Sequence, residues 1–122
     1  SKFKNSLQEN AKIHCMVEDV IESSHNGIVP WEIHSSVKPV LIQGKDDHIK
    51  TSLRWKILKE FFDMKNIDFK VIESVEGNIL SKITNLIYLL DYSTIYSAIL
   101  KNIDPSPVSS IDFIKNKLKM QE

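Results

Sequence analysis

Residues 79–100 form the longest apolar stretch of the chain, and the hydrophobic pattern predicts that the other elements are organised around it. The stretch is apolar on nearly every face of a helix, which is typical of a helix buried on several sides, here by its own sheet and by a second copy of the protein. Lys82, Asn85 and Asp91 interrupt it, whereas a membrane span needs about 20 nearly uncharged residues. We therefore expect a central helix of a globular domain.

The segment 104–107 (DPSP) is expected to follow the end of this helix. Proline has no amide hydrogen to donate and forces the residue before it out of the helical region. Residues 109–112 (SSID) then resemble a capping box. They predict a short second helix that carries Ile111, Ile114 and Leu118 along one face.

The middle of the chain alternates between strand and helix patterns. Residues 37–42 (VKPVLI) predict a buried strand, residues 47–65 carry apolar side chains at helical spacing, and residues 67–75 alternate as a second strand. Asn78 is expected to cap the central helix. Strands and helices in this order predict parallel strands with right-handed crossovers. The expected fold is therefore α/β, a three-layer αβα domain with a mainly parallel sheet flanked by helices.

The first 30 residues give a weaker pattern. Residues 1–11 predict the end of a helix with apolar residues on one side, residues 13–17 predict a short strand, and residues 18–30 predict a short helix or turn. The apolar side of the first helix is formed by Phe3, Leu7 and Ala11. The chain opens without an initiator methionine, so we expect it to be a piece of a longer protein.

Composition excludes few function classes. A chain of 122 residues suffices for one domain. Sixteen basic and sixteen acidic residues leave no net charge, which gives no support for binding to nucleic acid. The single Cys15 excludes an internal disulfide and a cysteine-based zinc site, and it favours a reducing, cytoplasmic setting.

Single residues indicate no particular chemistry. The three glycines are not grouped, so no glycine-rich phosphate loop is predicted. The histidines show neither the spacing of a Ser-His-Asp site nor that of a metal site, and each alone is interpreted as a surface or loop residue (His14, His25, His34 and His48). Glu9 alone would be a solvated carboxylate at a helix end. The residues taken singly predict an α/β domain of unknown function.

Five segments taken together resemble one family: QENAK (8–12), SHNGIVPW (24–31), VLI (40–42), IYLLDYSTIYSAILKNIDPSP (87–107) and IDFIK (111–115). In order and spacing they resemble the C-terminal sugar isomerase (SIS) domain of the bifunctional phosphoglucose/phosphomannose isomerases of archaea and some bacteria. The pattern DYxxxYxAILxxxDPxP is the most specific part. The resemblance implies that residues 1–122 are the C-terminal SIS domain, and that the N-terminal SIS half lies outside this chain.

The resemblance also implies the reaction. Family members interconvert glucose 6-phosphate and mannose 6-phosphate with fructose 6-phosphate through a cis-enediol, without a metal or another cofactor. Such chemistry needs a base that moves a proton between C1 and C2 and a group that opens the sugar ring. It also needs polar groups that stabilise the charge of the enediolate.

Four residues match the family's site. Glu9 matches the catalytic carboxylate of its N-E-N-(S/A)-K motif, and His25 matches the histidine of its H-N-E motif, which is assigned to ring opening across a dimer interface. Lys115 matches the catalytic lysine of the final helix, and Ser106 stands for the threonine of the DPTP segment as a substrate-binding residue. Gly27 departs from the glutamate of H-N-E, and Gln8 stands where asparagine is common.

The expected partners are a phosphorylated hexose, the N-terminal SIS domain of the same protein and a second copy of the chain. Neither nucleic acid nor a membrane is an expected partner. In the family, the serines and threonines that bind the substrate phosphate and an active-site arginine belong to the N-terminal half. The isolated chain is therefore expected to be inactive.

Two alternative hypotheses remain from the sequence. A phosphosugar-sensing SIS module would need a cluster of Ser and Thr residues beside a strand end and no base, whereas this chain has Glu9 and His25 and no such cluster. That difference favours an enzyme. A structural dimerisation domain stays open, as does the preference between glucose and mannose phosphates.

Overall fold

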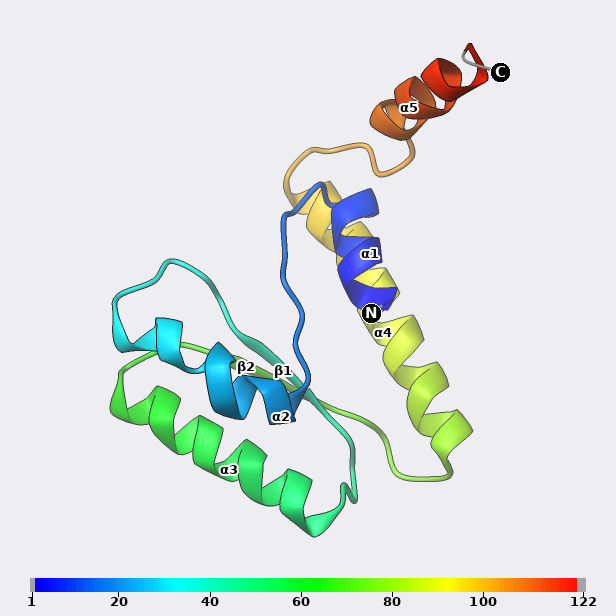
Figure 1. Cartoon of the computed structure of the whole chain (residues 1–122). Coiled ribbons are helices and arrows are strands. Elements are labelled where there is room, and N and C mark those ends of the chain that lie inside the picture. Colours follow the sequence, from blue (N-terminus) through cyan, green and yellow to red (C-terminus); the bar gives the residue numbers. More distant parts are fainter. Residues whose placement is uncertain (1, 121–122) are drawn as a thin grey trace. The chain divides into compact units, whose positions relative to one another are not determined.

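The computed structural model describes residues 2–120 and contains both helices and strands (Figure 1). In chain order the elements are α1 (Lys2–Asn10), α2 (Val20–Glu22), the π-helical η1 (Ser23–Gly27), the 3₁₀-helical η2 (Val29–Glu32), β1 (Val40–Gln43), α3 (Ile49–Met64), β2 (Lys70–Glu73), α4 (Ile79–Leu100) and α5 (Ser109–Lys119). The chain divides into two compact units, Val17–Leu86 and Ser1–Met16 with Ile87–Glu122. Each unit is described by itself.

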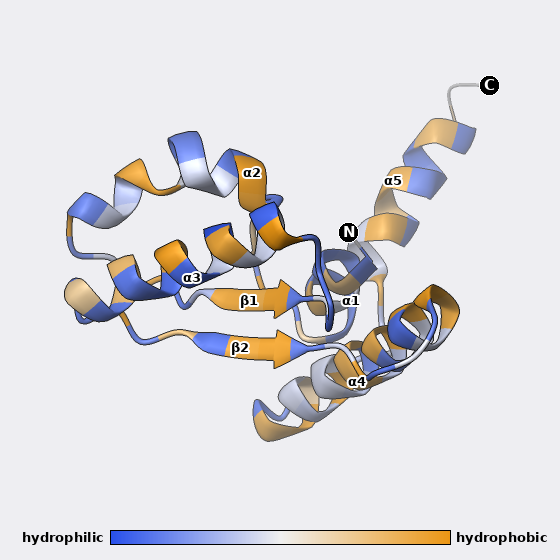
Figure 2. Cartoon of the chain, turned by 90° about the horizontal axis from the view of Figure 1, so that it is seen from below, coloured by the Kyte–Doolittle hydropathy of each residue, from blue (hydrophilic) through white to orange (hydrophobic). Residues whose placement is uncertain are grey.

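The unit Val17–Leu86 is built around two parallel strands. β1 and β2 pair in register from Val40 opposite Lys70 to Gln43 opposite Glu73. The connecting helix α3 lies along one side of the strands (Figure 2), and α2 contacts α3. The α/β class, the parallel pairing and the order of the elements are confirmed. β1 is shorter than predicted because Pro39 has no amide hydrogen to donate, although its carbonyl accepts a hydrogen bond from the amide of Lys70 (3.0 Å).

The core of this unit joins the sheet to α3. Leu41 of β1 and Leu58 and Phe62 of α3 are buried. The ring of Phe62, which is 2% exposed, lies edge-on to Trp31 with ring centroids 5.4 Å apart, and it lies 5.5 Å from the ring of Phe69. The segment 18–30, predicted as a short helix or turn, forms α2, η1 and the start of η2, and Trp31 of η2 covers this core.

His48 has a definite structural role that its sequence context did not reveal. It occupies the N-cap of α3, where its Nδ1 accepts a hydrogen bond from the amide of Lys50 (3.2 Å). An acceptor at this position satisfies one of the amides that have no partner inside a helix. His48 therefore stabilises the start of α3.

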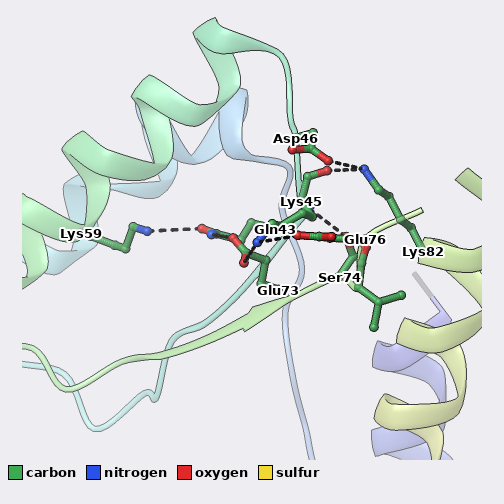
Figure 3. A network of polar contacts seen from close by, with 9 residues as sticks. Gln43, Lys45, Asp46, Lys59, Glu73, Ser74, Glu76 and Lys82 are labelled. Atoms are coloured by element: carbon green, nitrogen blue, oxygen red, sulfur yellow. Dashed lines mark hydrogen bonds and ion pairs between the residues drawn. The ribbon is translucent and has the colours of Figure 1, made fainter. Parts of the chain in front are cut away.

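Polar contacts join the loops at the carboxyl ends of the two strands (Figure 3). The side-chain amide of Gln43 donates to Glu73 Oε1 (2.9 Å), and the backbone amide of Lys45 donates to the hydroxyl of Ser74 (2.8 Å). Ser74 is buried, and its hydroxyl is satisfied both by this hydrogen bond and by its own donation to the carbonyl of Val75 (3.3 Å). These contacts fix the two loops to each other.

The first turns of α4 are fixed to the same loops. The predicted cap is confirmed, since the amide of Ser81 donates to Asn78 Oδ1 (2.9 Å). One turn later Lys82 donates to the carbonyl of Lys45 and lies 3.3 Å from Asp46 Oδ2 (Figure 3). A charged residue inside the apolar stretch thus anchors the first turns of α4 within this unit.

In the other unit, α1 packs along the second half of α4 through a polar stripe. Lys2 and Ser6 donate to the carboxylate of Asp91, and Asn10 Nδ2 donates to Thr94 Oγ1 (2.8 Å). Thr94 is fully buried, and its hydroxyl in turn donates to the carbonyl of Asp91 (2.7 Å). Positions 2, 6 and 10 are spaced by four residues and so lie on one face of the helix.

α4 has the predicted bounds, but in this chain it is buried on one narrow face. Leu90, Thr94 and Ala98 are buried, whereas Tyr88 and Leu100 are 62% and 85% exposed. Within this chain the short α1 covers only that face, and the predicted burial of α4 by a second copy of the protein stays a prediction. Among the described residues, no helix combines the length and the apolarity needed to cross a membrane.

Two local predictions were wrong. Residues 13–17 do not form a strand, because the amide of Ile13 bonds back to Leu7 O (3.2 Å) and the thiol of Cys15 lies 3.6 Å from Lys4 O. The capping box does not form either. The helix α5 begins at Ser109, one residue earlier than a capping box at Ser109 implies, and its N-cap is Val108, whose side chain cannot accept a hydrogen bond.

Replacing Phe62 with alanine is expected to lower the free energy of unfolding by about 3–5 kcal/mol, because a large buried ring would leave a cavity. Denaturant titration monitored by tryptophan fluorescence measures this change, since Trp31 contacts the ring. The control Met64→Ala, at a side chain that is 68% exposed on the same helix, should change it by less than about 1 kcal/mol. Equal effects of the two variants would contradict this description of the core.

The hydrogen bond from Lys2 and, after it, the one from Ser6 hold the pKa of Asp91 below its usual value. A carboxylate with a lowered pKa contributes stability that is complete above its unfolded pKa of about 3.9 and is lost as the pH falls through the folded pKa. Urea titrations from about pH 7 to about pH 3 should therefore show a smaller loss of stability in Asp91→Asn than in the wild type. The control Asp63→Asn, at an exposed position, should show the pH dependence of the wild type. The same pH dependence in Asp91→Asn would contradict the contacts of Asp91 with Lys2 and Ser6.

Candidate functional site

Glu9 lies on the part of α1 that does not pack on α4. The docked face carries the polar stripe at positions 2, 6 and 10 and the fully buried Ala11. The remaining face borders an open pocket of about 570 Å³, here called the Glu9 pocket. Its lining residues are Asn5, Gln8, Glu9, Lys12, Pro107, Val108, Ser109, Ser110 and Ile111. The packing of α1 therefore decides that Glu9 borders this pocket.

The opposite wall of the Glu9 pocket is the start of α5 with the two residues before it. The N-terminal end of a helix carries a partial positive charge from its unpaired amides. The pocket thus combines an exposed carboxylate with a wall suited to a polar, negatively charged molecule. The side chain of Glu9 is exposed there.

Lys12 joins the two walls of the pocket. Its ammonium donates to the carbonyl of Glu9 (2.6 Å) and to the carbonyl of Pro107 (2.7 Å). Its backbone has φ = 53°, in the left-handed region, which is typical of the residue that ends a helix. The QENAK motif thus supplies the pocket with both a carboxylate and a lysine.

Ser106 and Lys115 are not among the residues that line the Glu9 pocket. Ser106 is exposed in the loop before α5, and its amide donates to Asp104 Oδ1 (2.9 Å). This backbone hydrogen bond holds the pKa of Asp104 below its usual value. Lys115 is exposed on α5, one turn after Ile111 and on the same side of the helix. The structure therefore brings Glu9 close to the start of α5 but not to these two side chains.

His25 belongs to the unit Val17–Leu86 and is exposed in the π-helical segment η1. Such segments are rare and occur frequently at functional sites. Two polar contacts brace η1: the hydroxyl of Ser24 donates to Val20 O (2.5 Å), and Asn26 Nδ2 donates to Glu22 Oε1 (3.2 Å). The backbone around His25 is thus held in place while its imidazole remains open to solvent.

Gly27, the departure from the H-N-E motif, leaves room for another carboxylate. A Cβ atom at this position would lie 2.0 Å from Glu18 Oε2. The same oxygen accepts a hydrogen bond from the hydroxyl of Ser23 (3.1 Å). Any side chain at position 27 would therefore require Glu18 to move.

Sequence reasoning missed Lys12 and Asn10, although both lie in the QENAK motif beside Glu9. Asn10 could have been found from the spacing of polar residues at positions 2, 6 and 10, next to the apolar residues at 3, 7 and 11. Lys12 could not, because its contact with Pro107 joins residues that are 95 positions apart. Within residues 2–120, no three His, Cys, Asp or Glu side chains are grouped so that they could hold a metal ion.

Known proteins resemble this chain over most of its length. The family described as "Bacterial phospho-glucose isomerase C-terminal SIS domain" matches residues 1–118. The bifunctional phosphoglucose/phosphomannose isomerase of Caldicellulosiruptor bescii is 32% identical over 121 residues, which cover 96% of this chain and 36% of the relative. The protein of the same name from Aquifex aeolicus is 30% identical over 125 residues, covering 97% and 38%.

A more distant relative of the same name, from Thermoplasma acidophilum, is 25% identical over 122 residues, covering 96% of this chain and 37% of the relative. The chain thus spans somewhat more than a third of the length of these relatives. A comparison with solved structures gives no significant match. The resemblance that the sequence motifs predicted is confirmed, and the chain belongs to the family of C-terminal SIS domains of bacterial phosphoglucose isomerases.

Proposed function

We propose that this chain is the C-terminal domain of an aldose–ketose isomerase that interconverts glucose 6-phosphate and mannose 6-phosphate with fructose 6-phosphate. The observation that carries the proposal is the family match over residues 1–118, and relatives named for both isomerase activities support it. The N-terminal SIS half of the same protein would bind the substrate phosphate. The isolated chain is therefore expected to lack turnover.

Glu9 is the proposed base. As a carboxylate it would take the proton from C2 of the aldose, leaving an enediolate with negative charge on O1. A proton would then pass from the O2 hydroxyl to O1, and Glu9 would return its proton to C1 to give the ketose. The reverse reaction can return the proton to either face of C2, so one base would serve both aldose phosphates. The position of Glu9 in an open pocket supports this role, because a substrate must reach the carboxylate.

The other three residues have supporting roles in the proposal. His25 of the partner subunit would transfer a proton at the ring oxygen during ring opening, because an imidazole can act as a general acid or base. Lys115 would reach the sugar oxygens and stabilise negative charge on the enediolate. Ser106 would donate a hydrogen bond to the substrate. Exposure of all three side chains in this chain supports their availability to a ligand.

The proposed protein is a homodimer in the cytoplasm. Apolar and aromatic side chains that remain exposed on α4 support a further interface, since large apolar surfaces of this kind mark interaction sites. Tyr88 and Tyr92 lie stacked there with ring centroids 6.4 Å apart, and both are more than half exposed. The free thiol of Cys15 supports a reducing compartment.

Glu9→Gln in the longer protein is expected to lower kcat by about 10²–10⁴-fold on both aldose phosphates, because the amide cannot accept the proton. KM should change little, since glutamine keeps the size of the side chain. A coupled assay of fructose 6-phosphate formation measures both constants. Glu60→Gln, an exposed position on α3, is the matched control.

Unchanged turnover in Glu9→Gln would refute the role of Glu9 and would favour a sensing or dimerisation module. A loss on one aldose phosphate alone would contradict the shared base.

Tyr92→Glu is expected to weaken the dimer, because it would bury a charge in the proposed α4 interface. Sedimentation of the longer protein should show a dissociation constant at least about tenfold larger than that of the wild type. Met64→Glu, at an exposed apolar position on α3, should leave it unchanged. A dimer unaffected by Tyr92→Glu would place the interface elsewhere.

A further inference from the structure

Lys12 makes two hydrogen bonds, here called the Lys12 bridge, to the carbonyls of Glu9 and Pro107. They connect the end of α1 with a loop that lies far away in the sequence. Lys2, Ser6 and Asn10 attach α1 to α4. Among the side-chain hydrogen bonds of residues 2–120, the Lys12 bridge is the one that joins the end of α1 to the loop before α5. The bridge therefore holds the distance between the end of α1 and the loop before α5, which the hydrogen bonds between α1 and α4 do not set directly.

Both carbonyls of the bridge lie beside parts of the proposed site. One belongs to Glu9 itself. The other belongs to Pro107, the residue before the N-cap Val108. The carbonyl of Val108 accepts hydrogen bonds from the amides of Ile111 (2.8 Å) and Asp112 (3.2 Å) in the first turn of α5. A shift of either carbonyl would move the base or the helix that carries Lys115.

An ammonium group is well suited to this task. It has three donors and can bind two carbonyls at once, and hydrogen bonds from a charged donor are stronger than those between neutral groups. The left-handed backbone of Lys12 turns the chain at the end of α1, and the side chain then reaches back to Glu9. Lysine near a helix C-terminus also interacts favourably with the helix dipole.

We propose that Lys12 is a positioning residue of the isomerase site, which holds the carboxylate of Glu9 at a fixed separation from the start of α5. This inference rests on the proposed function. Lys12 acts through Glu9 and α5, and it needs no contact with the substrate. Its loss therefore lowers the rate of proton transfer more than it weakens substrate binding.

Lys12→Met in the longer protein tests the inference. A small misplacement of a catalytic group costs up to about 10²-fold in rate, so kcat should fall about 10- to 100-fold while KM changes less than about threefold. Lys12→Arg should recover most of the activity, because a guanidinium can also bind two carbonyls. The control Lys101→Met, at an exposed lysine just after the end of α4, should leave both constants unchanged.

A rise in KM with unchanged kcat would overturn the inference, because it would mean that Lys12 binds the substrate. Unchanged kinetics in Lys12→Met would overturn it too.

Amide hydrogen exchange in the present chain gives a readout that does not depend on catalysis. Without the bridge, the first turn of α5 should open more often, so the amides of Ile111 and Asp112 should exchange at least about threefold faster in Lys12→Met. They should exchange at the wild-type rate in Lys101→Met. Unchanged exchange in Lys12→Met would overturn the inference that the Lys12 bridge holds the start of α5. An inactive wild-type longer protein would instead refute the proposed function, and amide exchange would then decide whether the bridge exists.

Discussion

The hydrogen bond between Asn10 and the buried hydroxyl of Thr94 fixes which face of α1 is available for chemistry. The hydroxyl of Thr94 donates to the carbonyl of Asp91, and the side-chain amide of Asn10 supplies the donor for its oxygen. Such a hydrogen bond contributes about 0.5–1.5 kcal/mol, so this contact disfavours other rotations of α1 about its axis. The carboxylate of Asp91, which binds Lys2 and Ser6, fixes the same orientation from the other end of the helix. Glu9, next to Asn10, then borders the pocket as a consequence of packing.

The strongest sequence patterns predicted the fold well. The apolar stretch gave the bounds of α4, Asn78 gave its cap, and the alternation of patterns gave a parallel pair joined by α3. The run at 13–17 failed because a few apolar residues do not show whether a strand neighbour exists, and its first amide bonds back to α1. The prediction of a capping box failed because α5 begins at Ser109 itself, so Ser109 does not stand at the N-cap position.

Sequence motifs indicate candidate residues of the site but not their surroundings, for a physical reason. A motif can point to Glu9 as the proposed base because a base must be a particular residue type at a particular place. Contacts such as that of Lys12 with Pro107 depend on how distant segments meet, and no local pattern encodes them. The glycine at position 27 illustrates the same limit, because only the structure reveals that Glu18 fills the space beside it.

The most direct test of the proposed proton transfer is the isotope content of the products. Glu9 borders an open pocket, so a proton carried by this proposed base would be accessible to solvent and would exchange during the life of the proposed enediol. Fructose 6-phosphate converted by the longer protein in D₂O should therefore give glucose 6-phosphate and mannose 6-phosphate that both carry deuterium at C2, as detected by NMR. Products that form without any deuterium at C2 would contradict proton transfer through Glu9 and would indicate a direct hydride shift between C1 and C2.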